Sequence, residues 1–399
     1  MNKKVSLGVA ISLVAVACAI TFVLTMTVSL NMYNSMVTGV QERETINAKI
    51  KEIDTFVRSS SIYELEENDI LNGIMNGYIS GLDDKYAKYY TTSEYYKKQQ
   101  IESGEIIGVG IETVIEGDYL KITEVYEDSS AEVAEIRKDY VITKVNGKDI
   151  LAIGAEEAQR MLDGEEGTKL TITTKAPDGT ENTVTLVRQV IELQSVKGAI
   201  VDGYAYIKIS TFNGLTDDQF TQLIDKYESQ SVLGYIFDLR NVSEGDIAPL
   251  QSMLGRIMPK ATVAKKVLAD GSEEEILMTD GVQEIKKPIS VIVNTGTACT
   301  AELFAVALRD FSNAVLVGSV TAGKAELQTT KSFKDGSAVS ISTARVYPMQ
   351  SESFDDAGLK PDYIIDITQQ EEMAIKFADP STDVQLQKAV EAVASINLQ

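Results

Sequence analysis

A run of 26 residues without a charge, Val5–Leu30, constrains this chain more than any other feature. At about 1.5 Å per residue, a helix of that length crosses the roughly 30 Å hydrocarbon layer of a membrane. Lys3 and Lys4 precede the run, and the next basic residue is Arg43. The positive-inside rule therefore predicts a single-pass protein of the cell membrane, with a cytoplasmic N-terminus and an extracytoplasmic bulk from Asn31 onward.

A cleaved signal peptide is the alternative interpretation of the same run, although its apolar region would span only about 7–15 residues. The four residues ending in Cys18 weakly resemble a lipoprotein cleavage box, but the apolar run continues for twelve residues beyond it. We therefore expect an uncleaved signal anchor in residues 1–34, with Cys18 as a small apolar residue in lipid.

Charge and residue usage exclude several classes of function. The 399 residues include 37 basic and 59 acidic side chains, and the net charge of −22 argues against a nucleic-acid partner. The chain has no histidine, which excludes a Ser-His-Asp or Cys-His triad and a His-ligated metal site. Two cysteines, Cys18 and Cys299, are too few for a disulfide framework or a Cys-rich metal site. An enzyme here must use carboxylates, Lys, Ser/Thr, Tyr or one Cys, and we expect no metal or other cofactor.

The exported part begins with a polar, helical region over residues 35–104. Apolar residues between Ile70 and Leu82 recur at helical intervals, and Asp69 precedes them as a potential N-cap. The region ends in a Tyr/Lys cluster, Lys85–Lys98. We expect an amphipathic bundle that packs on the domain that follows.

Residues 105–192 change to short β-like segments. Asn146-Gly147 and Asp178-Gly179 are typical of hairpin turns, because these residue types tolerate positive φ. A short helix is expected over Ala155–Leu162. Strands and a helix beside an open edge form a small barrel that can bind an extended peptide by β-augmentation. The predicted strands are Ile106–Glu112, Leu120–Val125, Tyr140–Val145, Leu170–Thr174 and Thr183–Val187.

Residues 193–370 alternate apolar strands with helices, a pattern typical of an α/β domain whose strands are at least partly parallel. We expect strands over Tyr204–Ile209, Leu233–Leu239, Ile289–Asn294 and Val315–Val317, and helices near Leu215–Tyr227, Ile247–Ile257 and Thr300–Phe311. Residues 371–399 form a C-terminal helical segment. The predicted fold class is therefore α/β, or mixed α+β, behind an N-terminal transmembrane helix.

Gly318–Ala325 nearly matches a phosphate-binding loop, because it follows a strand and contains Gly-Lys. Ala325 stands where the Mg²⁺-binding hydroxyl belongs, and residues 328–333 look extended rather than helical. We therefore reject nucleotide binding.

Cys299 and Lys324 are the strongest candidates for chemistry. Cys299 directly precedes a predicted helix, whose unpaired N–H groups and positive dipole end favour a thiolate and can bind an oxyanion. Lys324 follows the next predicted strand, so both residues can meet at one edge of the sheet. A buried Lys there can act as a base, with Gln328 orienting its amine. For each residue alone, the commoner outcome is a buried inert thiol or an exposed loop lysine.

A third cluster, Asp238, Arg240 and Asn241, lies at the end of an apolar strand. Charged residues in that position commonly line the crevice of an α/β sheet. The alternative is an ion pair that ties the strand to its loop.

Together these segments resemble the C-terminal processing, or tail-specific, proteases. Members of this family are exported Ser-Lys peptidases with an inserted PDZ domain. The resemblance covers about residues 65–395 and rests on short motifs in the family's order and spacing. The motifs are GYAYIKISTFN at 203–213, DLRN at 238–241, VIVNTGTACTAE at 291–302, TAGKAELQ at 321–328, TARVY at 343–347 and GLKPD at 358–362.

The resemblance implies a nucleophile at Cys299, where the family has Ser, a general base at Lys324 and its orienting partner at Gln328. It also implies an oxyanion hole built from the backbone N–H groups of Gly245 and Cys299. Glu244 replaces a Gly of the family's Asn-Pro-Gly-Gly turn and brings a negative charge near that hole. In a PDZ-like domain, residues 105–192, the implied binding loop for a peptide C-terminus is Gly108, Val109, Gly110 and Ile111.

The implied protein is a membrane-anchored extracytoplasmic endopeptidase with its peptidase core in residues 193–370. It recognises protein C-terminal tails through the PDZ-like domain and contacts the membrane through residues 5–30, and a homodimer is a candidate assembly. The alternative is a catalytically inactive homologue that binds peptide tails, which Glu244 and the Ser-to-Cys change favour. A thiol redox sensor is the third interpretation, but the chain lacks a resolving Cys.

Overall fold

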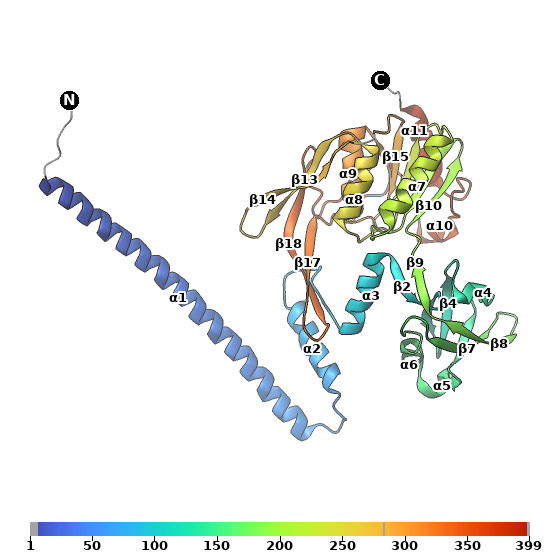
Figure 1. Cartoon of the computed structure of the whole chain (residues 1–399), viewed down its shortest axis with the longest axis horizontal. Helices are drawn as coiled ribbons and strands as arrows, with labels where there is room; N and C mark the ends of the chain where they lie inside the picture. The colour runs from blue at the N-terminus through green and yellow to red at the C-terminus, as the bar shows by residue number, and fades with distance from the viewer. Residues whose placement is uncertain (1–6, 282–283, 397–399) are drawn as a thin grey trace. The chain divides into compact units, whose positions relative to one another are not determined.

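The computed structural model describes residues 7–281 and 284–396, which divide into two compact units that meet between Ile74 and Met75. The first unit is dominated by one helix, α1, Leu7–Ser60 (Figure 1). Among the described residues, Ser12–Leu30 is the one helical stretch long and apolar enough to cross a membrane, a test that a signal sequence also passes. Residues 1–6 and 397–399, which belong to the predicted anchor and C-terminal segment, lie outside the described residues.

The region predicted as a helical bundle, residues 35–104, is built differently. Helix α1 continues unbroken to Ser60, and α2 covers Glu67–Ser80. Strand β1, Lys88–Tyr90, then interrupts the Tyr/Lys cluster before α3, Thr92–Ser103. Because α2 begins at Glu67, Asp69 lies in its first turn and not at the N-cap, although a carboxylate there still favours the positive end of the helix dipole.

The next segment folds into an antiparallel sheet in the order β3-β4-β5-β7-β8, with β6 paired to β5. Its apolar core includes the fully buried Leu120, Ile142 and Leu170. The strands are β3 (Ile111–Glu116), β4 (Tyr119–Val125), β5 (Val141–Val145), β6 (Lys148–Asp149), β7 (Lys169–Lys175) and β8 (Glu181–Val187). Three short helices accompany them: α4 (Ser130–Val133), α5 (Ile150–Ile153) and α6 (Ala155–Arg160).

One local prediction in this segment needs correction. The expected strand Ile106–Glu112 is broken, because β2, Glu105–Gly108, pairs with β9, Gln189–Glu192, whereas β3 pairs with β4. The break contains Gly110 at φ 88°, where an added Cβ would lie 2.0 Å from the Ser129 Cβ, so only glycine fits. The hairpin turn predicted at Asp178-Gly179 is confirmed, because it joins the antiparallel strands β7 and β8, with Gly179 at a positive φ.

The following segment carries a six-stranded sheet in the order β10-β11-β12-β15-β16-β19. The first pair is antiparallel and the remaining pairs are parallel, as the alternation of strands and helices predicts. The strands are β10 (Val196–Val201), β11 (Tyr204–Ile209), β12 (Tyr235–Asp238), β15 (Ile289–Val293), β16 (Val315–Gly318) and β19 (Tyr363–Ile364). The helices are α7 (Thr216–Ser229), α8 (Ile247–Ile257), α9 (Thr300–Ser312), α10 (Gln369–Ala374) and α11 (Val384–Ser395).

Helices cover both faces of this sheet, which explains why β12 and β15 are buried along their whole length. Phe220 of α7 and Phe304 of α9 pack with Phe237 of β12 on one face. Leu386 and Val393 of α11 belong to a separate apolar cluster on the other face. The carboxyl ends of β12, β15 and β16 therefore emerge together from a rigid three-layer core.

A second, antiparallel sheet lies beside this core, in the order β1-β18-β13-β14 with β17 also paired to β18. The strands are β13 (Ala261–Leu268), β14 (Glu273–Thr279), β17 (Glu326–Ser332) and β18 (Ala338–Pro348). Its first strand, β1, comes from the segment before α3, with Tyr89 opposite Val339. This pairing ties the segment around residue 90 to the rest of the second unit.

Arg240 binds two buried carboxylates and joins the end of β12 to α11. Its guanidinium donates to Asp238 at 2.6 and 2.9 Å and to Asp383 at 2.6 and 3.1 Å. Asp383 also accepts the N–H groups of Gln385 and Leu386 and so caps α11. Burial opposes the charge of Asp238, but Arg240 outweighs burial and holds the pKa of that carboxyl below its ordinary value. Asp238 and Arg240 therefore form the ion pair between strand and loop that the sequence analysis gave as the alternative.

We predict that Asp383→Ala lowers the free energy of unfolding by about 3–5 kcal/mol, because it leaves a buried guanidinium partly unpaired and removes a helix cap. Urea denaturation of the full chain in detergent measures this change. Glu391→Ala is the matched control on the same helix, since its ion pair with Lys388 is solvent-exposed, and it should change stability by less than about 1 kcal/mol. Equal effects of the two variants would contradict a structural role for the buried cluster.

Candidate active site

Cys299 lies between the end of β15 and the first residue of α9, as the sequence predicts. Its backbone has φ 52° and ψ −112°, a conformation that costs free energy for any residue with a side chain. The preceding loop is fastened to the end of β12, because Thr297 Oγ1 donates to the Leu239 carbonyl and the Ala298 N–H donates to the Val242 carbonyl. The surrounding structure therefore holds Cys299 in a strained position.

The carboxylate of Glu302, which the sequence analysis missed, organises the backbone around Cys299. Glu302 is fully buried in the first turn of α9. Its Oε2 accepts the N–H groups of Cys299 and Lys324, both at 2.9 Å. Its Oε1 accepts the Gly323 N–H at 2.8 Å and the Thr321 hydroxyl. Burial raises the pKa of Glu302 above its ordinary value, although these four donors oppose the shift.

The bond from the Cys299 N–H to Glu302 corrects the predicted oxyanion hole. That N–H is already engaged, so it is not free to bind an oxyanion in this structure. The other predicted donor, Gly245, has φ 151°, and an added Cβ there would lie 2.6 Å from the Phe212 Cβ. The Gly245 carbonyl accepts the Thr300 hydroxyl at 2.7 Å, which links the 242–245 turn to the start of α9.

The thiol of Cys299 is buried, with 8% of the residue exposed. Burial raises the pKa of the thiol above its ordinary value, and the positive charge of Lys324 opposes this shift only in part. The expectation that the helix terminus favours a resting thiolate is therefore wrong for this structure. The Sγ atom lies 3.9 Å from the Thr300 hydroxyl and 4.0 Å from the Glu326 carbonyl.

Lys324 lies in the loop between β16 and β17, and its Nζ is 4.7 Å from the centroid of the Tyr86 ring. Gln328 lies on β17, which begins at Glu326, so the chain after Lys324 is extended as predicted. The Gln328 Nε2 donates to the Glu326 carbonyl and to Ser342 Oγ, both at 3.1 Å. No hydrogen bond between Lys324 and Gln328 is present among the described residues.

Four of the predicted residues, Gly245, Cys299, Lys324 and Gln328, line one cavity of about 430 Å³. Asp238, Arg240 and Asn241 do not line it, and Asn241 instead hydrogen-bonds Asn294. Four charged side chains also line the cavity: Lys98, Glu102, Glu244 and Asp246. Of these, the sequence analysis placed only Glu244 near the site.

The predicted tail-binding loop lies apart from this cavity. Gly108 ends β2 and Ile111 begins β3, with Val109 and Gly110 between the strands. The Val109 carbonyl accepts the Ala131 N–H, and the Gly110 carbonyl accepts the Tyr126 N–H, both at 3.0 Å. These bonds fix the loop at the start of β3. A groove of about 370 Å³ is lined by Ile115, near the other end of β3, and by residues of α5 and α6, and the loop is not part of its lining.

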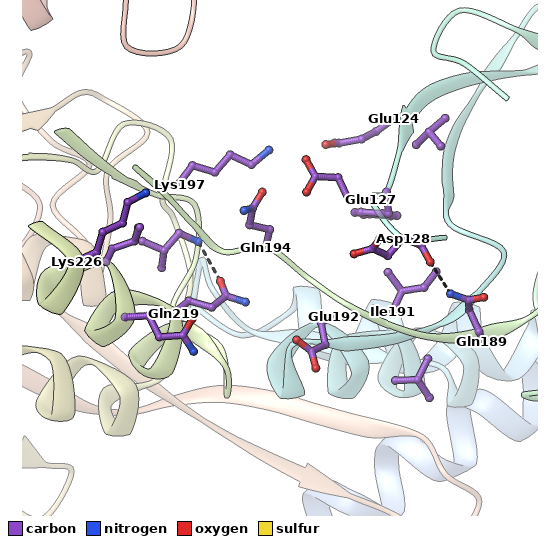
Figure 2. Close-up of a pocket in the computed structure, with 16 residues that line it drawn as sticks. Glu124, Glu127, Asp128, Gln189, Ile191, Glu192, Gln194, Lys197, Gln219 and Lys226 are labelled. Carbon is purple, nitrogen blue, oxygen red and sulfur yellow. Dashed lines mark hydrogen bonds between the residues drawn. The ribbon is translucent and has the colours of Figure 1, made fainter. Parts of the chain in front are cut away.

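A larger cavity, about 810 Å³, contains none of the predicted site residues. Figure 2 shows Lys197 and Lys226 on one side of it and Glu124, Glu127 and Asp128 on the other. Its lining combines the end of β4 and strand β9 with residues of β10 and α7.

Residues 203–365 match peptidase family S41, and residues 121–175 match the PDZ domain. The carboxy-terminal processing protease CtpA of Bacillus subtilis (strain 168) is 27% identical over 363 residues, covering 90% of this chain and 77% of the relative. A probable CtpA-like serine protease of Staphylococcus aureus (strain MSSA476) is 29% identical over 337 residues, covering 84% and 68%. A putative S41 protease from Bacteroides fragilis has a similar fold, with a TM-score of 0.52 at 15% identity over 85% of this chain and 93% of that chain.

We predict that Cys299 reacts with iodoacetamide with a pH midpoint above the ordinary thiol value of about 8.5, since burial raises the thiol pKa. Lys324→Ala should move the midpoint higher still, because it removes the positive charge that favours the thiolate. The alkylation rates are measured in the full chain carrying Cys18→Ser, so that Cys299 is the one thiol that can react. Lys331→Ala, an exposed residue of β17, is the control and should leave the midpoint unchanged. A midpoint well below 8.5 in the parent would contradict the neutral resting thiol.

Proposed function

This chain belongs to the C-terminal processing protease family, and on that premise we propose that it is a membrane-anchored extracytoplasmic endopeptidase whose nucleophile is Cys299. The observation that carries the proposal is the single cavity lined by Cys299, Lys324, Gln328 and Gly245. We further propose that residues 105–192 bind the C-terminal tail of a substrate and that residues 193–370 cleave it. The apolar segment of residues 5–30, within which Ser12–Leu30 is a helical stretch long enough to cross a membrane, would hold the enzyme there.

In the proposed reaction, a tail held at the Gly108–Ile111 loop leads a peptide bond into the cavity. The reaction takes place in molecules whose Lys324 amine has lost its proton. There Cys299 Sγ attacks the carbonyl carbon while the thiol proton passes to that amine. The Gly245 N–H stabilises the oxyanion, since the Cys299 N–H is engaged by Glu302. Lys324 then gives the proton to the departing amine, which leaves a thioester. Lys324 takes a proton from water during hydrolysis and returns it to the thiol.

A neutral, buried thiol makes this chemistry resemble that of a serine. A preformed pair of thiolate and ammonium would lose the hydration of both charges in the cavity, which costs free energy. Because burial raises the thiol pKa, attack and proton removal are coupled in one step, and the base remains necessary. Replacement of Ser by Cys thus keeps the same role for Lys324.

The second candidate function is a tail-binding protein without peptidase activity. Two observations favour it: the Cys299 N–H is unavailable as an oxyanion donor, and Glu244 lines the cavity with a negative charge. In that protein the PDZ-like domain would bind tails and the core would serve as a scaffold.

We predict that the full chain in detergent cleaves a disordered protein with an apolar C-terminus, and that Cys299→Ala and Lys324→Ala lose at least about 10³-fold in rate. Cleavage is followed by mass spectrometry of the products. Cys299→Ser tests whether Lys324 also activates a hydroxyl. Full activity in Lys324→Ala would overturn the Cys-Lys mechanism, and tail binding without cleavage by the parent or by Cys299→Ser would establish the second function.

We predict that Glu244→Gln raises kcat by about 2–5-fold, because it removes a negative charge near the developing oxyanion, an effect of about 1 kcal/mol or less at an exposed position. The gain should shrink as salt is added, since exposed charges are screened. Glu352→Gln, an exposed residue outside the cavity, is the matched control and should leave kcat unchanged. A loss of activity in Glu244→Gln would show that the carboxylate has a positive role.

A further inference from the structure

Asp84 lies behind the cavity of Cys299 and Lys324, where it hydrogen-bonds next to two residues that line it, Tyr86 and Gln328. It precedes β1 and is half-buried. Its Oδ2 accepts the Ser342 N–H at 2.7 Å, and its Oδ1 accepts the Ser342 hydroxyl at 3.0 Å. The same Oδ1 accepts the Tyr86 N–H at 3.0 Å. One carboxylate therefore joins the segment before β1 to β18, 258 residues further along the chain.

The bonds to Ser342 determine the orientation of the Gln328 amide. Because the Ser342 hydroxyl donates its one proton to Asp84, its oxygen can only accept from Gln328. The two N–H groups of the Gln328 amide then go to Ser342 Oγ and to the Glu326 carbonyl. The remaining polar atom is Oε1, an acceptor, which is the atom that an amine or ammonium donor requires.

Asp84 also positions the Tyr86 ring. The turn that begins at Asp84 is closed by the Ala87 N–H, which donates to the Asp84 carbonyl at 3.1 Å. The ring of Tyr86 then lies with its centroid 4.7 Å from Lys324 Nζ, within the range of a cation–π contact. Tyr86 lines the same cavity as Lys324 and Gln328. The Lys324 amine therefore lies against the Tyr86 ring, and Gln328 lines the same cavity.

We propose that Asp84 is a positioning residue for the peptidase reaction, fixing Gln328 Oε1 and the Tyr86 ring around the amine of Lys324. The inference rests on the proposed function for its catalytic consequence, but the geometry that it describes can be tested without cleavage. Asp84 acts through other side chains and does not touch the reacting atoms. It makes the segment before β1 part of the active site.

Loss of the carboxylate should release the amide of Gln328. In Asp84→Ala the Ser342 hydroxyl is free to rotate and donate to Gln328 Oε1, so the amide can flip and direct an N–H at Lys324, a donor facing a donor. We expect kcat to fall by about 10–100-fold with KM within about twofold, because positioning of the base matters in the transition state and not in tail binding. Asp84→Asn, which keeps one acceptor oxygen, should retain an intermediate rate.

The activity test is a double-mutant cycle between Asp84→Ala and Ser342→Ala, with kcat and KM measured for each variant. If Asp84 acts through Ser342, the double variant should be only slightly slower than Asp84→Ala, and additive effects would overturn the proposal. Thr92→Ala is the matched control, because Thr92, the first residue of α3 just after β1, donates its hydroxyl to the Asp335 carbonyl at 2.9 Å outside the cavity. A comparable loss of kcat in Thr92→Ala would indicate a merely structural role and would also overturn it.

A second measurement does not depend on cleavage. In the full chain labelled with ¹⁵N-glutamine, the side-chain resonances of Gln328 are identified by their loss in Gln328→Ala. They should shift and exchange faster with solvent in Asp84→Ala and Ser342→Ala, but not in Thr92→Ala. If the parent cleaves nothing, the proposed function fails, while these shifts would still support the positioning. Unchanged Gln328 resonances in Asp84→Ala would overturn it, whatever the activity.

Discussion

The buried carboxylate of Glu302 is the interaction on which the site depends. A carboxylate in a dry interior is stable only when donors surround it, and here four donors come from both catalytic loops. The same ion therefore fixes the start of α9 and the loop that carries Lys324, so Cys299 and Lys324 keep their relative positions. A consequence of this arrangement is that the Cys299 N–H is used for structure, which leaves Gly245 as the predicted oxyanion donor.

The burial that stabilises this framework also determines the chemistry of the thiol. Cys299 is held at a positive φ by loops that are fastened to β12, and it is shielded from water at the first turn of α9. The helix dipole and Lys324 would favour a thiolate in a more exposed site, but burial disfavours any isolated charge. In the proposed mechanism, this competition is the reason that the thiol needs a proton acceptor, even though sulfur is more acidic than a hydroxyl.

Local sequence signals predicted the elements around the site well, because they depend on neighbouring residues. The start of α9 at Thr300, the strand β16 and the extended chain after Lys324 all follow from apolar periodicity and turn residues. Glu302 had only a weak signal, a Glu three residues after the cap, which is common at helix starts. Asp84 had none, since its partner Ser342 is 258 residues away and neither residue belongs to a recognisable motif. Asp238 and Arg240 gave a strong signal, but their partner Asp383 shows that the signal was structural.

The segment before β1 is held in place by the backbone pairing of β1 as well as by the carboxylate of Asp84. Four residues after Asp84, the chain enters β1 and pairs with β18 through Lys88, Tyr89 and Tyr90. Backbone pairing of this kind fixes the register, so the side chains just before it reach the same strand positions whenever the pair forms. Ser340 and Ser342 are two residues apart on β18, so their side chains face the same side of the strand. Ser340 pairs with Lys88 of β1, and Ser342 hydrogen-bonds Asp84. Tyr86 and Tyr90 of this stretch line the same cavity as Lys324, so the pairing of β1 with β18 supplies part of the cavity wall.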